Sequence, residues 1–237
     1  MPSRFVFRQI YYGDLDCFLA DGEIRSKNHP NMQACHQTSY QEIVDRRGTA
    51  EFQMPCGGVV NDYVAFYFSP LTAFTFTIDR GNVNLRDLDG SILGSATSDD
   101  RVFLVANVEQ FRNAGSELHF SDFPLNSQAS LPTLENDLNK LESHVHWDVF
   151  DDAPKVARIP EVGFDGVCKY FADRDTPARY QNRSSKRMAE FLVKDAVSLN
   201  LIDCIIAKNG NIGENLQRRM DASNWNIPVY AKPGCYF

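Results

Sequence analysis

One carboxylate, Glu190, lies inside a short apolar run in the last quarter of the chain. Residues 186–193 read KRMAEFLV, and a run of this length is typical of a strand end that packs on a core. Alternation along a strand places Glu190 and Leu192 on one face and Phe191 and Val193 on the other. A carboxylate among apolar neighbours loses hydration unless it is paired, and acids and bases are tuned for catalysis in such sites.

The same pattern also fits a purely structural glutamate. Such a residue would extend to solvent at the strand end, or it would pair with Lys186 or Arg187. Structural ion pairs also shift the pKa values of carboxylates, so a buried carboxylate is not by itself a sign of catalysis. Periodicity alone therefore favours this structural interpretation of Glu190 over a catalytic one.

A second stretch, residues 57–70, reads GGVVNDYVAFYFSP and predicts an aromatic strand. The two glycines permit unusual backbone angles just before it. One face of this strand carries Tyr63, Ala65 and Tyr67, whereas the other face is apolar and is expected in the core. The tyrosine face fits either a stacking platform for a flat ring or a half-buried sheet surface. Ser69–Pro70 is typical of a helix N-cap followed by the first helical residue.

The remaining elements follow from hydrophobic periodicity and capping residues. Ser39 and Glu42 fit a capping box and predict a helix that ends at Gly48, with Arg46–Arg47 in its last turn, where the helix dipole favours cations. In chain order, the other predicted elements are a strand at 4–10, a helix from 14 to Gly22, a strand at 102–108, a helical turn ending near Gly115, a strand at 118–121, a helix after Thr133, a polar loop at 171–187, a strand at 202–207, a helix from 211 and a strand at 227–231. Without regular βαβ alternation, this order predicts an α+β fold.

Length and composition indicate an ordinary globular chain. Its 237 residues are 43% hydrophobic and 23% charged, and no linker or repeat divides them, so we expect one domain over residues 1–237. The net charge of −7 argues against wholesale coating of nucleic acid but leaves room for a local basic patch. No apolar run is long enough to span a bilayer, and the N-terminus lacks the apolar core of a signal peptide.

Cysteine and histidine spacing gives no sign of a metal site. The six cysteines are scattered without a CxxC pair, and we expect them to be reduced thiols of a cytoplasmic protein. His144 and His146 share a face of any extended segment, but no third ligand lies near them in the sequence, so no metal is expected. The glycine-rich motifs of Rossmann and P-loop nucleotide sites are absent.

Three segments, in this order, resemble the DarT family of DNA ADP-ribosyltransferase toxins. The first is residues 7–15 (FRQIYYGDL), which a short helix and Gly22 follow. The second is the aromatic stretch at 57–70. The third is the run at 186–193, which DTP at 175–177 and a basic loop precede. The resemblance covers nearly the whole chain, and it implies an ADP-ribosyltransferase fold in which two antiparallel β-sheets, flanked by short helices, surround an NAD+ cleft.

The resemblance also implies a chemistry, the transfer of ADP-ribose from NAD+ to a base of single-stranded DNA. Loss of nicotinamide leaves an oxocarbenium-like ribose, which a facing acidic group stabilises. The same group can accept a proton from the attacking base nitrogen. The resemblance therefore assigns the catalytic role to Glu190 and reverses the preference from periodicity. Because an atom inside a duplex stack is out of reach, a single-stranded substrate is expected.

Further site residues are expected on the first strand, on the tyrosine face and in the basic loop. The expected NAD+-binding residues are Arg8, Gln9, Tyr11, Asp14, Tyr63 and Tyr67. Of these, Tyr63 is the candidate for stacking on nicotinamide or orienting its ribose. The expected DNA-binding residues are Arg174, Arg179, Tyr180 and Arg183. Cations in this loop suit phosphates, and its aromatic rings suit stacking on bases.

The chain departs from the thymine-modifying members of the family at two places. Those members typically read Thr-His where this chain has Ile10–Tyr11, and they carry an arginine after the proline of the aromatic strand, where this chain has Leu71–Thr72. Arg8 or Arg80 is a candidate to replace the lost charge. We interpret the departures as a sign of a different branch, with guanine slightly favoured over thymine as the modified base.

Two other functions fit the same residues. One keeps the NAD+ chemistry and changes the acceptor to RNA or protein, which the acidic net charge mildly favours. The other is a catalytically silent module that binds NAD+ or nucleic acid. If the protein is a toxin, we expect a cognate antitoxin with a macrodomain-type ADP-ribosylglycohydrolase, and no membrane partner.

Overall fold

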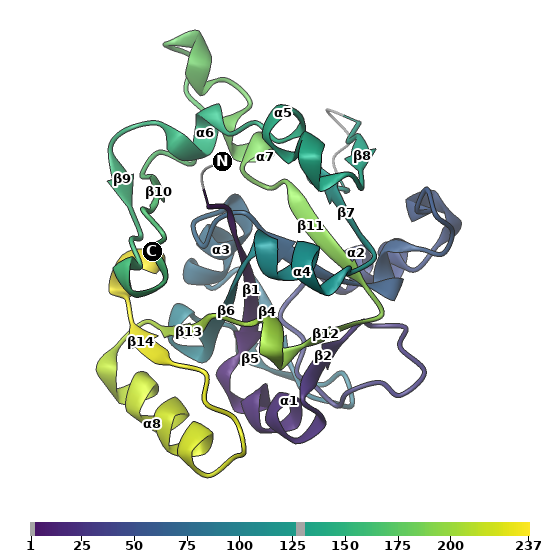
Figure 1. The fold of residues 1–237 in the computed structure, drawn as a ribbon, viewed down its shortest axis with the longest axis vertical. Coiled ribbons are helices and arrows are strands. Elements are labelled where there is room, and N and C mark those ends of the chain that lie inside the picture. The colour runs from purple at the N-terminus through teal and green to yellow at the C-terminus, as the bar shows by residue number, and fades with distance from the viewer. Residues whose placement is uncertain (1–2, 127–130) are drawn as a thin grey trace.

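An eight-stranded sheet forms the centre of the computed structural model, which describes residues 3–126 and 131–237 (Figure 1). Neighbouring strands run antiparallel except for one parallel pair at the edge, β13 and β14. In spatial order the strands are β14 (Val229–Ala231), β13 (Cys204–Ala207), β6 (Arg101–Asn107), β1 (Phe5–Tyr11), β3 (Tyr63–Tyr67), β11 (Glu190–Lys194), β7 (Leu118–Ser121) and β8 (Leu134–Glu135). The predicted α+β class is confirmed.

The sheet has a narrow junction at its middle. β1 pairs with β6 along seven residues and β3 pairs with β11 along five, but β1 and β3 share a single registered pair, Phe7 opposite Tyr67. Two antiparallel halves therefore meet at this point, as the prediction of two sheets around a cleft requires.

One face of the junction strands is packed with phenylalanines. Phe66 on β3 and Phe191 on β11 are at most 1% exposed, and both contact Phe111 of α4 (Val108–Ala114), with ring centroids 5.8 and 5.1 Å apart. Burying one such side chain contributes about 2 kcal/mol. α4 lies in front of the sheet in Figure 1. The predicted core face of the aromatic strand is confirmed, and Glu190 and Tyr67 lie on the opposite face.

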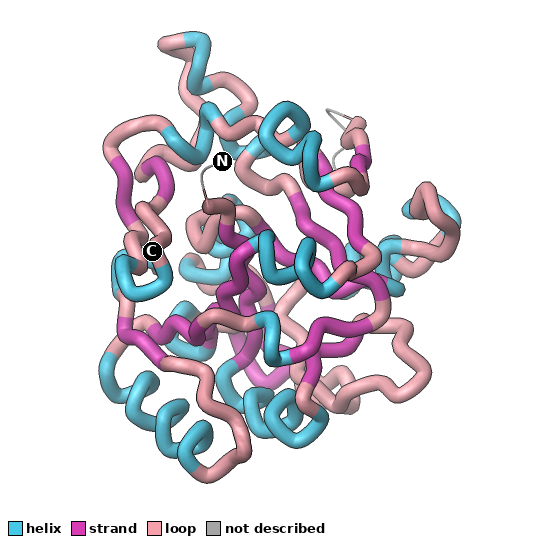
Figure 2. Tube along the Cα trace, in the orientation of Figure 1, coloured by secondary structure: helices cyan, strands magenta, loops and turns pink. Residues whose placement is uncertain are grey.

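Short helices and small two-stranded sheets surround the central sheet, with long connections between them. Figure 2 shows the connection between β2 and α2, residues 26–40, drawn as loop. The helices are α1 (Leu15–Asp21), α2 (Gln41–Arg47), α3 (Ala73–Asp79), α5 (Leu141–His144), α6 (Asp148–Asp151), α7 (Arg183–Lys186) and α8 (Gly210–Asp221). The small sheets pair β2 (Glu23–Arg25) with β12 (Ala196–Ser198), β4 (Asn84–Arg86) with β5 (Ile92–Ser95), and β9 (Lys155–Val156) with β10 (Val167–Cys168).

Two predicted helix starts are wrong. The helix after the aromatic strand begins at Ala73, because Thr72 accepts a hydrogen bond from the Thr75 N–H, whereas Ser69 closes a turn with Leu71. α2 follows Tyr40 without a side-chain cap, so the capping box at Ser39 does not form.

The predicted helix after Thr133 is also wrong. Leu134–Glu135 instead extends the sheet as β8, because Ser121 of β7 pairs with Leu134. The Thr133 N–H and hydroxyl both donate to the Asp122 carboxylate and fix this edge strand. A tertiary pairing thus overrides the helical spacing at Leu134, and helical structure resumes at a 3-10 turn, Leu138–Lys140, which leads into α5.

The histidine pair after this strand does not converge on one point. His144 Nε2 lies 3.1 Å from the Thr133 carbonyl oxygen, whereas the His146 ring packs on Phe123. Across residues 3–126 and 131–237, no three His, Cys, Asp or Glu side chains are grouped as metal ligands. None of the helices in these ranges has the length and apolarity that a bilayer crossing requires.

Candidate active site

Glu190 occupies the first position of β11, beside the junction of the two half-sheets. It pairs in register with Tyr67 of β3, so the two side chains share a face. Its backbone N–H donates to the Ser121 hydroxyl of β7 at 2.9 Å, and the residue is only 1% exposed. A strand on each side therefore fixes the position of this carboxylate.

Arg47, the last residue of α2, clamps the carboxylate with both ends of its guanidinium. Arg47 Nη2 donates to Glu190 Oε2 at 2.6 Å, and Nη1 donates to Oε1 at 3.2 Å. The Leu125 N–H adds a third hydrogen bond, to Oε1, at 3.2 Å. A two-pronged pairing of this kind fixes the plane of the carboxylate as well as its charge. Burial without such partners would strongly disfavour the ionised form.

The sequence analysis missed the role of Arg47. Two adjacent arginines at a helix end look alike in a sequence, but only one can face the sheet. Arg46 is on the exposed side and pairs with Glu51, another exposed residue. A helix dipole explains neither of these specific partners, and the only available signal was that the pair lies at the end of a helix with no buried residue of its own.

The tyrosine next to the catalytic candidate is Tyr67 rather than Tyr63. Tyr63 lies opposite Lys194 at the far end of the strand pair, is 4% exposed, and packs edge-on against His119. It belongs to a small apolar cluster and therefore does not offer the open stacking surface expected from the sequence. Burial first, and then the Glu190 charge, raise the pKa of the Tyr67 phenol, which keeps it neutral beside the carboxylate.

We expect the two tyrosines to respond differently to truncation. Tyr67→Ala should raise the KM for NAD+ by about fivefold or more, because an aromatic contact of about 1 kcal/mol is lost beside Glu190. Tyr63→Ala should instead lower the melting temperature and leave KM nearly unchanged. Steady-state kinetics and thermal unfolding of both variants measure this difference, and a larger KM effect in Tyr63→Ala would restore the assignment made from the sequence.

The predicted residues of the first strand and turn lie in two different settings. Arg8 Nη1 donates to the Ala65 carbonyl at 2.8 Å, across the junction, and burial lowers the pKa of its guanidinium to about 10. Tyr11 packs on His36 with ring centroids 4.5 Å apart. Asp14 holds this histidine, because the His36 N–H donates to Oδ2 at 3.0 Å and the His36 ring Nδ1 lies 2.7 Å from Oδ1. Asp14 thus fastens the loop before α2 onto the first strand.

The family model described as ssDNA thymidine ADP-ribosyltransferase, DarT, matches residues 14–237. The chain belongs to the DarT family. Two curated relatives are named DNA ADP-ribosyl transferase. The Thermus sp. (strain 2.9) protein is 26% identical over 178 residues, which are 75% of this chain and 69% of that protein. The Escherichia coli O127:H6 protein is 21% identical over 196 residues, which are 83% of this chain and 76% of that one.

The fold is that of solved DarT structures. Thermus sp. 2.9 DarT in complex with ADP-ribosylated ssDNA superposes with a TM-score of 0.75 at 20% identity, over 99% of this chain and 96% of that chain. The same protein in complex with NAD+ gives 0.72 at 19% identity, over 99% and 98%. Thermosipho africanus DarTG in complex with ADP-ribose gives 0.64 at 13% identity, and this chain covers 51% of its length. The predicted family, ADP-ribosyltransferase fold and enzyme class are confirmed.

The two departures from other DarT sequences have clear structural settings. Tyr11 forms the platform under His36. Leu71 is 4% exposed within the core, and its carbonyl accepts a hydrogen bond from Arg187 Nη2 at 2.8 Å. An apolar side chain that packs in the core therefore occupies this position.

The DNA-binding candidates in the basic loop divide into two groups. Arg174 and Arg179 are exposed, and their guanidinium groups lie over aromatic rings of the loop, with Arg174 4.6 Å from the Tyr170 ring centroid and Arg179 5.0 Å from that of Tyr180. Tyr180 is 8% exposed, so its ring supports these cations rather than lying free for a base. The two exposed arginines remain candidates for phosphate contacts.

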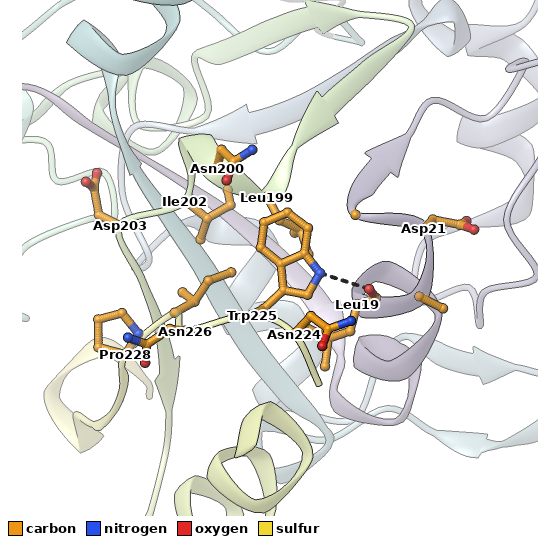
Figure 3. A pocket seen from close by; sticks show the side chains of 13 residues that line it. Leu19, Asp21, Leu199, Asn200, Ile202, Asp203, Asn224, Trp225, Asn226 and Pro228 are labelled. Atoms are coloured by element: carbon orange, nitrogen blue, oxygen red, sulfur yellow. Dashed lines mark hydrogen bonds between the residues drawn. The ribbon is translucent and has the colours of Figure 1, made fainter. Parts of the chain in front are cut away.

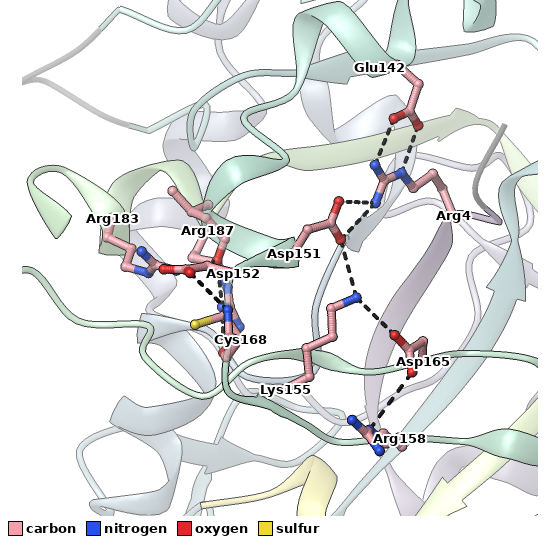
Figure 4. A network of polar contacts seen from close by, with 12 residues as sticks. Arg4, Glu142, Asp151, Asp152, Lys155, Arg158, Asp165, Cys168, Arg183 and Arg187 are labelled. Carbon is pink, nitrogen blue, oxygen red and sulfur yellow. Dashed lines mark hydrogen bonds and ion pairs between the residues drawn. The ribbon is translucent and has the colours of Figure 1, made fainter. Parts of the chain in front are cut away.

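Arg183 does not lie with these exposed arginines, contrary to the expectation from the sequence. It is 1% exposed and donates to the Tyr170 and Val149 carbonyls and to Asp152. Arg187 lies beside it and donates to the Cys168 carbonyl at 2.9 Å (Figure 4). Both guanidinium groups are used to hold the base of the loop, because a loop of this polarity has few apolar contacts of its own. At 1% exposure, Arg183 is too buried to serve as an open phosphate contact.

A cavity of about 910 Å³ lies away from Glu190 (Figure 3). Residues of α1, of the turn 199–203 and of the segment 224–228 line it, and Trp225 Nε1 donates to the Leu19 carbonyl at its wall. None of its lining residues comes from β3, β11 or α2. The cavity is therefore separate from the catalytic candidate.

Proposed function

We propose that the protein transfers ADP-ribose from NAD+ to a base of single-stranded DNA, with Glu190 as the catalytic residue. The observation that carries the proposal is the buried Glu190 carboxylate, which Arg47 grips at both oxygens at the junction of two half-sheets. A carboxylate fixed in this way is preorganised for a cation that develops in front of it.

The arrangement supports a substitution at the ribose carbon that carries nicotinamide. The bond from that carbon to nicotinamide breaks, and its electron pair leaves with the nicotinamide ring. Glu190 stabilises the positive charge on the ribose, and it accepts the proton that the attacking base nitrogen loses. Tyr67 lies beside this position, and the buried polar groups of β1 and β6 that lack partners suit the rest of a dinucleotide.

The acceptor is proposed from the family and from the exposed cations of the loop. Thermus sp. 2.9 DarT is described in one structure in complex with ADP-ribosylated ssDNA and in another in complex with NAD+. These descriptions support single-stranded DNA as the acceptor and NAD+ as the donor for this protein. The departures at Tyr11 and Leu71 favour guanine as the base, whereas the family model is named for thymidine. Oligonucleotides that contain only one of the two bases separate these alternatives.

Neutralising Arg174 or Arg179 is expected to weaken binding of a single-stranded oligonucleotide. Each lost phosphate contact should make the slope of the logarithm of the binding constant against the logarithm of the salt concentration shallower by about 0.7. Fluorescence titrations at several salt concentrations, with the Arg→Gln variants, measure this slope. Arg158→Gln is the matched control, because Arg158 is 60% exposed and lies by the separate β9–β10 sheet. Equal slopes in all variants would remove the loop from the DNA site.

A partner and a cellular role complete the proposal. The chain covers only 51% of Thermosipho africanus DarTG, a protein described in complex with ADP-ribose. We further propose a cytoplasmic toxin with a cognate antitoxin of the macrodomain type, which removes ADP-ribose from DNA, and the name DarTG supports such a partner. The toxin role is tested by the growth of cells that express the chain with and without such an enzyme. We expect the chain alone to arrest growth, and we expect Glu190→Gln to abolish the arrest.

Two other functions give different outcomes in one experiment. Incubation of labelled NAD+ with single-stranded DNA, RNA or lysate protein shows which acceptor gains the label. Label on DNA alone supports the proposal, whereas label on RNA or protein alone contradicts it. A silent binding module would transfer no label to any acceptor, while it would still bind the dinucleotide or the oligonucleotide.

A further inference from the structure

Arg101, the first residue of β6, is a buried cation without a partner. It is 3% exposed, and its Nε and Nη1 atoms are buried with no hydrogen-bond partner. No ion pair within residues 3–126 and 131–237 includes it. Burial lowers the pKa of this guanidinium to about 9, even though Asp14 and Asp100 act in the opposite direction. A fully buried arginine is nearly always paired, so this position calls for an anion.

The other buried arginines use most of their donors, although, within the described residues, Arg187 also lacks an ion pair and its Nε also has no partner. Arg187 donates to four oxygens, including Ser69 Oγ and the Cys168 carbonyl, and Arg183 donates to two carbonyls and Asp152. Their burial is explained by the loop that they hold. The nearest polar contact of Arg101 with Tyr236 involves only its backbone, because the Tyr236 hydroxyl lies 3.1 Å from the Arg101 carbonyl oxygen and 2.8 Å from that of Ile206.

Other unpartnered polar atoms lie on the same two strands. Nine buried side-chain nitrogen or oxygen atoms in the described part of the chain lack a partner, and four of them belong to Arg8, Gln9 and Arg101. They include one amide oxygen, Gln9 Oε1, which accepts, and guanidinium nitrogens, which donate. A ligand that carries both hydroxyl groups and anionic oxygens satisfies both kinds at once.

Strand register places Gln9 and Arg101 on the face of Glu190. Phe7 lies opposite Tyr67, which lies opposite Glu190, so the three side chains share one face. Gln9 and Tyr11 follow Phe7 on that face at alternate positions, and Arg101 pairs with Tyr11. Tyr11 lies four residues after Phe7, so Arg101 is about 13 Å along β1 from the row of Phe7, Tyr67 and Glu190. This separation is within the length of an extended dinucleotide.

The anion is not supplied by the protein. Both Asp14 oxygens are used by His36, and neither Asp14 nor Asp100 lies within ion-pair distance of the guanidinium. We propose that Arg101 binds the diphosphate of the dinucleotide and that Gln9 accepts a hydrogen bond from one of its ribose hydroxyls. The inference rests on the proposed function, since the diphosphate is the only anionic group of NAD+.

Calorimetric titration of Arg101→Gln with ADP-ribose, ADP and adenosine tests the assignment. We expect the Kd for ADP-ribose and ADP to rise by about tenfold to a hundredfold, as loss of a charge-assisted contact predicts. Adenosine, which lacks phosphate, should bind the variant and the wild type equally. Arg101→Lys should give an intermediate Kd, because it restores the charge without the planar fork.

A thermal measurement separates this role from a structural one. Because Arg101→Gln removes an unpaired buried charge, the ligand-free variant should melt at the same temperature as the wild type or higher. Its stabilisation by ADP-ribose should shrink at the same time. Arg158→Gln, which removes an arginine that is 60% exposed, should change neither quantity.

Three results would overturn the inference. The first is a lower melting temperature of Arg101→Gln together with a wild-type stabilisation by ADP-ribose. The second is a loss of adenosine binding as large as the loss of ADP-ribose binding. The third is a loss of oligonucleotide binding alone, which would assign Arg101 to DNA phosphate. Failure of the wild type to bind either NAD+ or ADP-ribose is a separate result and would overturn the proposed function as well.

Discussion

Replacing Glu190 by glutamine is expected to lower the rate of ADP-ribose transfer by at least about a hundredfold. The substitution keeps the size of the side chain and one acceptor oxygen for Arg47 and the Leu125 N–H. In the proposed mechanism, it removes the negative charge that faces the ribose and the group that takes the proton. Single-turnover assays with NAD+ and an oligonucleotide measure the loss, and calorimetry with ADP-ribose verifies that the ligand still binds.

The matched control for this variant is Glu117→Gln. Glu117 is half exposed and pairs with Lys194 at the other end of β11, so its charge is remote from the junction. Its substitution should change the rate by less than about twofold, as exposed ion pairs contribute little. A near wild-type rate in Glu190→Gln would show that another group performs the catalysis.

Arg47→Gln is expected to lower the rate by about tenfold to a hundredfold, the value of a two-pronged charged contact. Without Arg47, the buried Glu190 carboxylate keeps only the Leu125 N–H and loses its fixed orientation. Breaking this mostly buried pair should also destabilise the fold by about 3 kcal/mol. Kinetics and urea unfolding of the variant measure the two effects.

The neighbouring arginine provides the control. Arg46→Gln removes an exposed pair with Glu51 and should leave both the rate and the stability close to those of the wild type. In the double variant Arg47→Gln/Glu190→Gln, the two losses should not add, because the residues act as a unit. Equal effects of Arg46→Gln and Arg47→Gln would contradict the positioning role.

Local patterns predicted the strands of the site well. The alternation in the aromatic strand placed Phe66 in the core, and the alternation around Glu190 placed Phe191 on the face opposite the carboxylate, because two-residue periodicity follows directly from strand geometry. It did not indicate that Tyr67, rather than Tyr63, pairs with Glu190. The C-terminal glycines of two helices, Gly22 and Gly115, adopt the left-handed conformation expected of helix stops.

The sequence did not indicate which residue each arginine side chain contacts. Whether Arg47 or Arg46 turns toward the sheet depends on how α2 docks, which no local spacing records. The basic loop shows the same limit, because Arg183 is buried by contacts with segments that are distant in sequence, whereas Arg174 and Arg179 are exposed. The unpaired Arg101 likewise became visible only when the packing around β6 was known.

The most direct test of the proposed transfer is mass spectrometry of nucleosides from a single-stranded oligonucleotide treated with the protein and NAD+. We expect one ADP-ribosyl group on a base, formed with the wild type, much reduced with Arg47→Gln and absent with Glu190→Gln. Duplex DNA of the same sequence should gain little, because its bases are stacked. Release of nicotinamide without any modified base, or an adduct that forms equally with Glu190→Gln, would contradict the assignment of Glu190 as the catalytic residue of a DNA ADP-ribosyltransferase.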